Sequence, residues 1–160
     1  MKQEKQFKNL IYTVSSLFLL SMSQVALADG NMATVKIPEK VKSECASCHM
    51  VYQPGFLPKE SWARIMNNLS NHYGVDASLD PQSVKEINQW LVNHSGTGKK
   101  IAVPPPKDRI TESAWFLKEH REISQKVWSN PKVKSKSNCM ACHTAADKGN
   151  YDEDYVRIPK

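Results

Sequence analysis

The segments CASCH at residues 45–49 and CMACH at residues 139–143 together contain all four cysteines of the 160-residue chain. Both have the pattern C-x-x-C-H, whose two thiols and histidine recur at i, i+3 and i+4 and so share one face of a helical turn. This spacing lets the thiols bond the two vinyl groups of one porphyrin while the histidine ligates its iron. The sequence therefore predicts two covalently bound haem c groups. Their thioether residues are Cys45, Cys48, Cys139 and Cys142, and their proximal ligands are His49 and His143.

Other uses of these cysteines are a reactive dithiol, a pair of disulfides and a zinc site. Zinc sites usually combine separated pairs of Cys and His, and a redox-active Cys pair does not need an adjacent His. The complete five-residue pattern occurs twice and leaves no cysteine over. This repetition favours haem attachment.

Residues 1–28 have the composition of a secretory signal peptide. Three lysines precede an apolar stretch from Leu10 to Leu20, and Ala26-Leu27-Ala28 has the small-x-small pattern of a cleavage site. The apolar stretch is shorter than the roughly 20 residues of a membrane-spanning helix, which favours cleavage after Ala28 over an uncleaved anchor. We expect the remaining chain to be exported by the secretory route to the bacterial periplasm, which is an oxidising compartment.

The whole chain has a formal charge of +6, and residues 29–160 carry +4 because the cleaved segment holds three lysines and one acid. This mild basic excess permits docking to an acidic protein, or transient contact with a membrane surface, but requires neither. Nothing in the chain resembles a nucleic-acid-binding module, and we expect a monomer. We also expect the haems to form much of the core, so that the protein without them is largely unfolded.

Apolar spacing predicts an all-α fold. Together with the two haem motifs, it predicts a small, mainly helical c-type cytochrome with two haem-bearing halves and long irregular loops. One short helix begins at Pro38-Glu39 and carries the 45–49 motif. A second runs from Pro58 to about Asn71, and a third from Asp80-Pro81 to about Asn93. A fourth is capped by Thr111 and runs on to Trp128.

The Gly- and Pro-rich residues 96–108 predict a linker, because consecutive prolines favour an extended spacer. It separates an N-terminal haem c half, residues 29–95, from a C-terminal haem c half, residues 109–160. In the N-terminal half, Tyr52, Phe56 and Leu57 are expected to cover the edge of the first haem.

Three of the five histidines remain once His49 and His143 are assigned as proximal ligands. His72 and His120 lie on the apolar sides of two predicted helices, where a histidine is more often a core residue. Here each iron needs a second axial ligand, which favours both as distal ligands. His94 stands at the polar end of a helix, where an exposed histidine beside the helix dipole is the simpler expectation.

Met66 competes with His72 as a ligand, but its spacing from Leu69 suits core packing better. Chain proximity pairs His72 with the first haem and His120 with the second, and a crossed arrangement stays open. Irons with two histidine ligands have no free position for oxygen, nitric oxide or peroxide. Without a methionine thioether, such centres have low reduction potentials. The prediction is therefore an electron carrier rather than an enzyme.

From about Cys45 to Pro159 the chain resembles the bacterial dihaem cytochrome c family, often called DHC. The matching segments are CASCHMVYQPGFLPKESWARIMNNLSNHYGVDASLD, RITESAWFLKEH, NCMACHTAADKG and the closing RIP. Both haems of that family are bis-histidine centres, so the resemblance implies ligand roles for His72 and His120 and leaves His94 spare. It also implies periplasmic electron transfer between a membrane cytochrome b and a small monohaem cytochrome that binds oxygen or nitric oxide.

The alternative is a haem enzyme of the peroxidase or nitrogen-oxide reductase type. Such an enzyme needs one open iron position with a general acid–base group beside it. A gas sensor or gas carrier would need the same open position. If His72 or His120 were not a ligand, it could supply the acid–base group.

Overall fold

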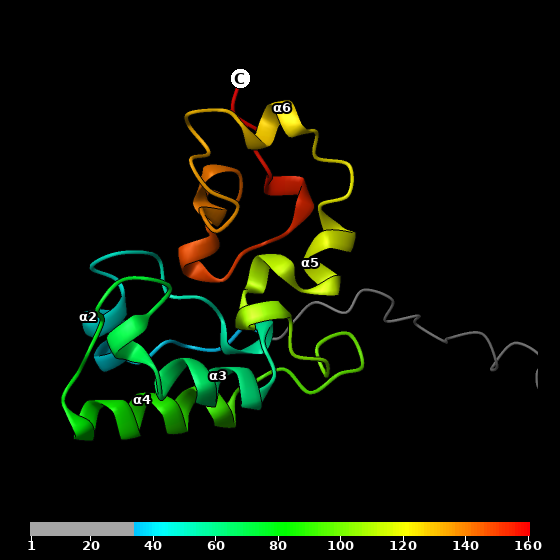
Figure 1. The fold of residues 1–160 in the computed structure, drawn as a ribbon. Helices are drawn as coiled ribbons and strands as arrows, with labels where there is room; N and C mark the ends of the chain where they lie inside the picture. The colour runs from blue at the N-terminus through cyan, green and yellow to red at the C-terminus, as the bar shows by residue number, and fades with distance from the viewer. Residues whose placement is uncertain (1–33) are drawn as a thin grey trace, which may run out of the picture. The chain divides into compact units, whose positions relative to one another are not determined.

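A computed structural model describes residues 34–160, and the predicted signal peptide lies outside them. This part of the chain consists of short helices and turns, with two isolated β-bridges between His72 and Val75 and between His143 and Val156 (Figure 1). The predicted all-α class is confirmed. Within residues 34–160, no helix combines the length and the apolar character needed to cross a membrane.

The α-helices are α2 (Glu39–Cys45), α3 (Lys59–Met66), α4 (Pro81–Asn93), α5 (Ala114–Glu119) and α6 (Gln125–Trp128). The 3₁₀ turns are η1 (Pro54–Phe56), η2 (Leu69–Asn71), η3 (Pro106–Asp108), η4 (Ile110–Glu112), η5 (Cys139–Ala141), η6 (Ala146–Lys148) and η7 (Glu153–Tyr155).

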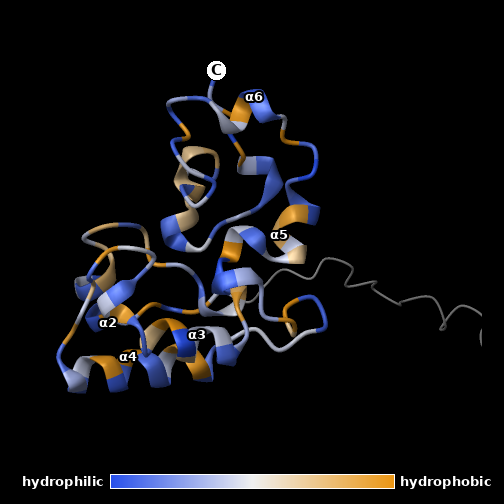
Figure 2. Cartoon of the chain, in the orientation of Figure 1, coloured by the Kyte–Doolittle hydropathy of each residue, from blue (hydrophilic) through white to orange (hydrophobic). Residues whose placement is uncertain are grey.

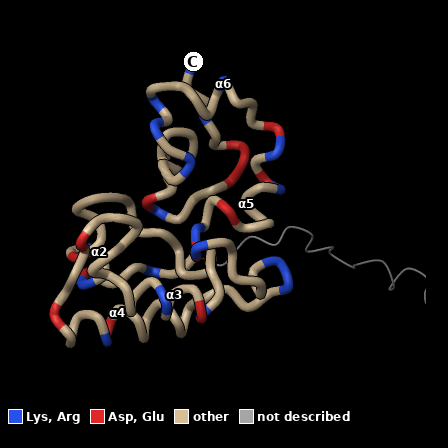
Figure 3. The backbone as a smooth tube through the Cα atoms, viewed as in Figure 1, with Lys and Arg blue, Asp and Glu red and all other residues tan. Residues whose placement is uncertain are grey.

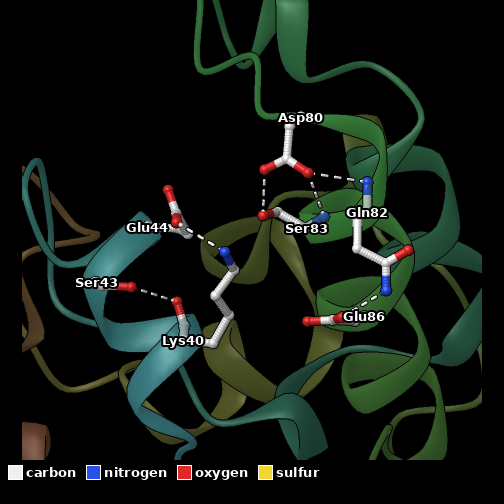
Figure 4. A network of polar contacts seen from close by, with 7 residues as sticks. All are labelled: Lys40, Ser43, Glu44, Asp80, Gln82, Ser83 and Glu86. Carbon is white, nitrogen blue, oxygen red and sulfur yellow. Dashed lines mark hydrogen bonds and ion pairs between the residues drawn. The ribbon is translucent and has the colours of Figure 1, made fainter.

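The third predicted helix is confirmed as α4, whose first turn is fixed by Asp80. One Asp80 carboxylate oxygen accepts hydrogen bonds from the backbone N–H groups of Gln82 and Ser83, both at 3.0 Å (Figure 4). The other accepts from the Ser83 hydroxyl, and this bond is the main cause that lowers the pKa of Asp80. The ionised cap therefore supports α4 at neutral pH, and its contribution is lost as the pH falls through the lowered pKa.

Three other helix predictions were too long. The helix from Pro58 stops at Met66 and the chain restarts as η2, because Asn67 and Asn68 have amides that compete with helical hydrogen bonding. The helix predicted from Thr111 to Trp128 is split into α5 and α6. The first motif is not wholly helical, since α2 ends at Cys45 and the rest of the motif is a turn.

Ser113, rather than the predicted Thr111, caps α5. Its hydroxyl oxygen accepts from the backbone N–H of Phe116 at 3.3 Å and its hydroxyl donates to the carbonyl of Ile110 at 2.7 Å. The side chain is buried, so alanine would leave both backbone groups without this partner. The physical reason for the shift is that η4 takes up residues 110–112 before α5 begins.

Ser113→Ala should lower the free energy of unfolding of the purified protein by about 1 kcal/mol, the usual cost of losing such a cap. Chemical denaturation followed by far-ultraviolet circular dichroism measures this change. Thr111→Ala is the matched control and should cost much less. Equal losses in the two variants would show that Ser113 does not cap the helix.

Two apolar cores lie in the described chain. The first joins α2, α3 and α4, whose apolar positions are coloured orange in Figure 2. Its buried residues are Ile37, Val41, Leu57, Trp62, Met66, Ile87 and Leu91. The second core is smaller, and its buried residues are Phe56, Ile101, Trp115 and Phe116. Tyr52 and Ile110 pack against both cores.

The turn η1 is held by an indole from each core. Trp62 donates from Nε1 to the carbonyl of Pro54 at 2.7 Å, and Trp115 donates to the carbonyl of Phe56 at 3.2 Å. Both bonds are buried, where an unpaired indole N–H or carbonyl is costly. Phe56 itself packs in the second core, and the expectation that it covers the edge of the first haem stays a prediction.

Residues 96–108 form a packed connection rather than an extended spacer. Gly96 donates its N–H to the carbonyl of Leu57 at 2.9 Å. A Cβ atom at Gly96 would clash with the carbonyl oxygen of Gly55, so only glycine permits this approach. Ile101 is buried in the second core. The division into two haem-bearing halves stays a prediction, but the segment between them packs against residues on both sides of it.

Candidate haem-binding sites

The structure brings His49 and His72 together. Their ring centroids are 6.1 Å apart and the rings are inclined by 22°. His49 Nδ1 lies 2.6 Å from the carbonyl oxygen of Met50, so an Nδ1–H donor leaves Nε2 free to bind a metal. His72 directly follows η2, where paired backbone hydrogen bonds with Val75 hold it at 2.8 and 3.2 Å.

The second pair is His120 with His143, also with ring centroids 6.1 Å apart, at an interplanar angle of 75°. His120 ends α5, its Nδ1 lies 2.9 Å from the carbonyl oxygen of Phe116, and its ring stacks on the Phe116 ring. His143 donates its backbone N–H to the carbonyl of Cys139 at 2.8 Å. Its own Nδ1 is buried and has no hydrogen-bond partner among residues 34–160.

Both separations suit two imidazoles on opposite sides of one metal atom. A metal lies about 2 Å from a histidine nitrogen. The corners of a five-membered ring with bonds of about 1.33 Å lie about 1.1 Å from its centre. Opposed imidazoles on one iron therefore have centroids about 6 Å apart, as the two pairs do at 6.1 Å. The residues present fit an iron between each pair.

The electrostatic surroundings favour neutral imidazole, which is the form that binds metals. Burial lowers the pKa of His72, and the neighbouring His49 lowers it further. The pKa of His143 is lowered in the same way, first by burial and then by His120. One imidazole of each pair, His72 in the first and His143 in the second, is thus favoured in its neutral form.

None of the four cysteines is paired in a disulfide. Cys45 ends α2 and Cys139 begins η5, so each motif starts at a helical terminus. Burial raises the pKa of Cys139 to about 11. A neutral thiol at Cys139 suits neither a thiolate zinc ligand nor a reactive dithiol at the second motif. Within residues 34–160, no three Cys, His, Asp or Glu side chains gather as a site for a bare metal ion.

His94 lies outside both histidine pairs. It caps the end of α4, and its Nδ1 is 2.8 Å from the carbonyl oxygen of Trp90 on the same helix. Met66 is buried in the first core, as its spacing suggested.

The sequence of residues 41–151 matches the family model described as dihaem cytochrome c. The chain belongs to the dihaem cytochrome c family. It is therefore a c-type cytochrome with two haem c groups, and the four cysteines are present for their covalent attachment. The resemblance predicted from the sequence is confirmed. The assignment of individual axial ligands stays a prediction.

Two solved structures are similar along most of this cytochrome. The X-ray structure of a dihaem cytochrome c from Shewanella baltica OS155 is 43% identical, with a TM-score of 0.67, and the match covers 77% of this chain and 95% of that one. The crystal structure of DHC from Rhodobacter sphaeroides is 38% identical, with a TM-score of 0.64, and the match covers 74% and 100% of the two chains. A search of curated proteins gave no match.

Sequence reasoning missed how Tyr52 connects the two motifs. Its ring stacks on His49, with centroids 5.1 Å apart, and its hydroxyl donates to the carbonyl of Ser137 at 2.9 Å. Ser137 precedes Cys139 by two residues, so Tyr52 touches the first histidine pair and the approach to the second motif. Tyr52 and Ser137 are 85 residues apart in the chain, and no local sequence pattern reveals their hydrogen bond.

Tyr52→Phe should lower the free energy of unfolding of the haem-loaded protein by about 1 kcal/mol, because it removes the hydrogen bond to Ser137 and keeps the ring. Chemical denaturation measures the loss. Tyr155→Phe is the control, since Tyr155 is exposed. A loss no larger than in the control would mean that the Ser137 hydrogen bond contributes nothing.

Proposed function

We propose that this cytochrome is a low-potential electron carrier with two six-coordinate, bis-histidine haems. His49 and His72 ligate the first iron, and His143 and His120 ligate the second. The observation that carries the proposal is the pair of imidazole couples at 6.1 Å, one beside each C-x-x-C-H motif. Membership of the dihaem cytochrome c family is consistent with electron transfer.

When bound, each haem supplies an iron that takes up or releases one electron. The residues of the chain hold both axial positions, so no face of the iron is left for a substrate. Carbonyl groups that accept from Nδ1 of His49 and His120 fix the tautomer and the ring orientation of the ligands. Two basic imidazoles favour the oxidised iron, which supports a low potential.

The same residues argue against an enzyme. A peroxidase or a reductase needs an acid–base side chain next to an open iron position. His72 and His120 are the side chains that could serve, and the ring centroid of each lies 6.1 Å from that of a motif histidine, which supports a ligand role instead. A side chain that fills the sixth position cannot also act on a substrate there.

The route of electrons is part of the proposal. A membrane cytochrome b is the proposed donor, and a small monohaem cytochrome is the proposed acceptor, on the strength of the family resemblance. The proposed location of this electron transfer is the periplasm. The predicted signal peptide and the oxidising chemistry of that compartment support it. The small basic excess suits short-lived contacts with acidic partners.

Carbon monoxide tests the proposal directly. The dithionite-reduced protein should show a low-spin absorption spectrum that carbon monoxide does not change, because both irons are saturated. A change accounting for about one haem of the two would reveal an open position and would favour the enzyme or the gas-binding protein.

A further inference from the structure

A cavity of about 650 Å³ lies beside His72. The other proposed axial ligands, His49, His120 and His143, do not line it. Its lining includes three cationic side chains, Arg64, Lys107 and Arg109, and one acid, Asp108. The amides of Asn68 and Asn71 also line it. Elsewhere in the described chain, basic and acidic positions are mostly interspersed (Figure 3). The lining thus combines a cationic excess with hydrogen-bond donors, which suits an anion.

The charges of the lining leave an excess of two positive charges. Arg64 is neutralised by Asp108, with Nη2 2.6 Å from Oδ1 and Nε 2.9 Å from Oδ2. Lys107 and Arg109 then remain. Arg109 stacks over the Tyr73 ring at 4.4 Å, and its Nε lies 4.0 Å from Glu112, which is not part of the lining. An anion with two negative charges would balance the cavity.

An unusual backbone conformation presents these cations. Lys107 and Asp108 are consecutive non-glycine residues with φ of 53° and 54°, in the left-handed region that most residues avoid. The ion pair with Arg64 holds the turn, and the Tyr73 hydroxyl donates to the carbonyl of Asp108 at 3.0 Å. Such a conformation persists only where surrounding contacts enforce it.

The proposed ligand His72 in the lining of the cavity points to the source of the anion. The cavity is lined by His72, but neither Cys45 nor Cys48 nor His49 takes part in the lining. Thioether bonds hold the vinyl edge of a haem c at the two cysteines, and the two propionate groups project from the other edge. The cavity has a proposed ligand of the first iron in its lining and neither cysteine, so the anionic edge of that haem is the anion we assign to it.

We infer that Lys107 and Arg109, with Arg64 and the two amides, bind the propionates of the first haem. Two carboxylates carry two negative charges, which match the excess charge of the lining. This inference rests on the proposed ligation of the first iron by His72. Cations that bind the propionates of a haem also act on its iron, and they favour its reduced state over its oxidised state.

The test compares Lys107→Asn, Arg109→Gln and the double variant with the wild-type protein, all loaded with both haems. Asparagine tolerates the left-handed conformation of position 107. Redox titrations over a range of pH should show that the midpoint potential of one haem falls and that of the other is unchanged. The potential of the affected haem should also gain pH dependence near neutrality, because propionates without cations bind protons more readily.

Lys85→Gln on the exposed side of α4 is the matched control, since it removes one positive charge from a position outside the cavity. Infrared difference spectra with ¹³C-labelled propionates should shift in the cavity variants only. The inference is overturned if the cavity variants lower both potentials by no more than Lys85→Gln does. It is overturned as well if they change neither a midpoint potential nor the labelled infrared bands. It is also overturned if added inorganic phosphate changes the wild-type potential, because the cavity would then take up anions from solution.

The absorption spectrum with carbon monoxide, recorded on the same samples, separates this inference from the proposed function. A saturated low-spin spectrum with unmoved potentials would defeat the propionate site and leave the electron carrier standing. A wild-type protein that binds carbon monoxide would instead defeat the proposed ligation, whatever the potentials.

Discussion

His72→Ala should convert one haem of the two from low spin to high spin and make it bind carbon monoxide. His72 is the proposed second ligand of the first iron, and its ring centroid lies 6.1 Å from that of His49, so we expect its removal to open one axial position. His120→Ala should do the same to the other haem, because His120 faces His143 at the same separation. In each case the spectral change should account for about half of the total haem, as one iron of two is affected.

Absorption and electron paramagnetic resonance spectra of the oxidised and reduced variants measure the change. His94→Ala is the control and should leave both haems low-spin, because the His94 ring nitrogen bonds within its own helix. The double variant His72→Ala/His120→Ala should bind carbon monoxide at both irons. If either single variant stays low-spin and saturated, the histidine replaced in it is not a ligand.

The expected effect on the potential follows the same reasoning. A high-spin iron with one histidine and a vacant position loses the donation of one imidazole, so its reduced state becomes easier to reach. The potential of the altered haem should therefore rise, opposite in direction to the change expected from removing Lys107 or Arg109. The two kinds of variant thus separate ligation from charge.

Features set by local chemistry were predictable from the sequence. Asp80-Pro81 fixes the start of α4 because a carboxylate cap and a proline at the first helical position need only neighbouring backbone groups. The C-x-x-C-H motifs were equally clear, since thioether attachment requires that spacing. The family match then confirmed two haem c groups.

Features that depend on distant contacts were not predictable. Ser113 rather than the predicted Thr111 caps α5 because η4 precedes the helix, and Phe56 lies in the second core because it packs against Trp115. The bond between Tyr52 and Ser137 joins segments that no periodic pattern relates. Chain proximity suggested the same histidine pairs that lie together in the structure, but spacing alone also allowed the crossed arrangement.

Loss of the second haem should unfold most of residues 121–160. Among the buried hydrophobic residues, only Val133 and Ala146 belong to this stretch, and the second core draws its buried residues from positions before 121. So few apolar side chains cannot offset the entropy of ordering forty residues. Haem c supplies the missing apolar surface, so Cys139→Ser/Cys142→Ser should remove one haem and most of the protection of these amides from hydrogen exchange.

Cys45→Ser/Cys48→Ser is the matched comparison, because it removes the other haem from a region with a larger core of its own. Seven buried residues hold α2, α3 and α4 together, so protection of α3 and α4 should survive in part. Hydrogen exchange measured by mass spectrometry, with the haem content checked by pyridine haemochrome spectra, distinguishes the two variants. Equal loss of protection in both would mean that the first core depends on haem as strongly as the C-terminal residues do. Retained protection of residues 121–160 without the second haem would contradict the prediction, and their order would then have to come from contacts such as the Tyr52–Ser137 bond and the packing of Tyr151 on Phe56.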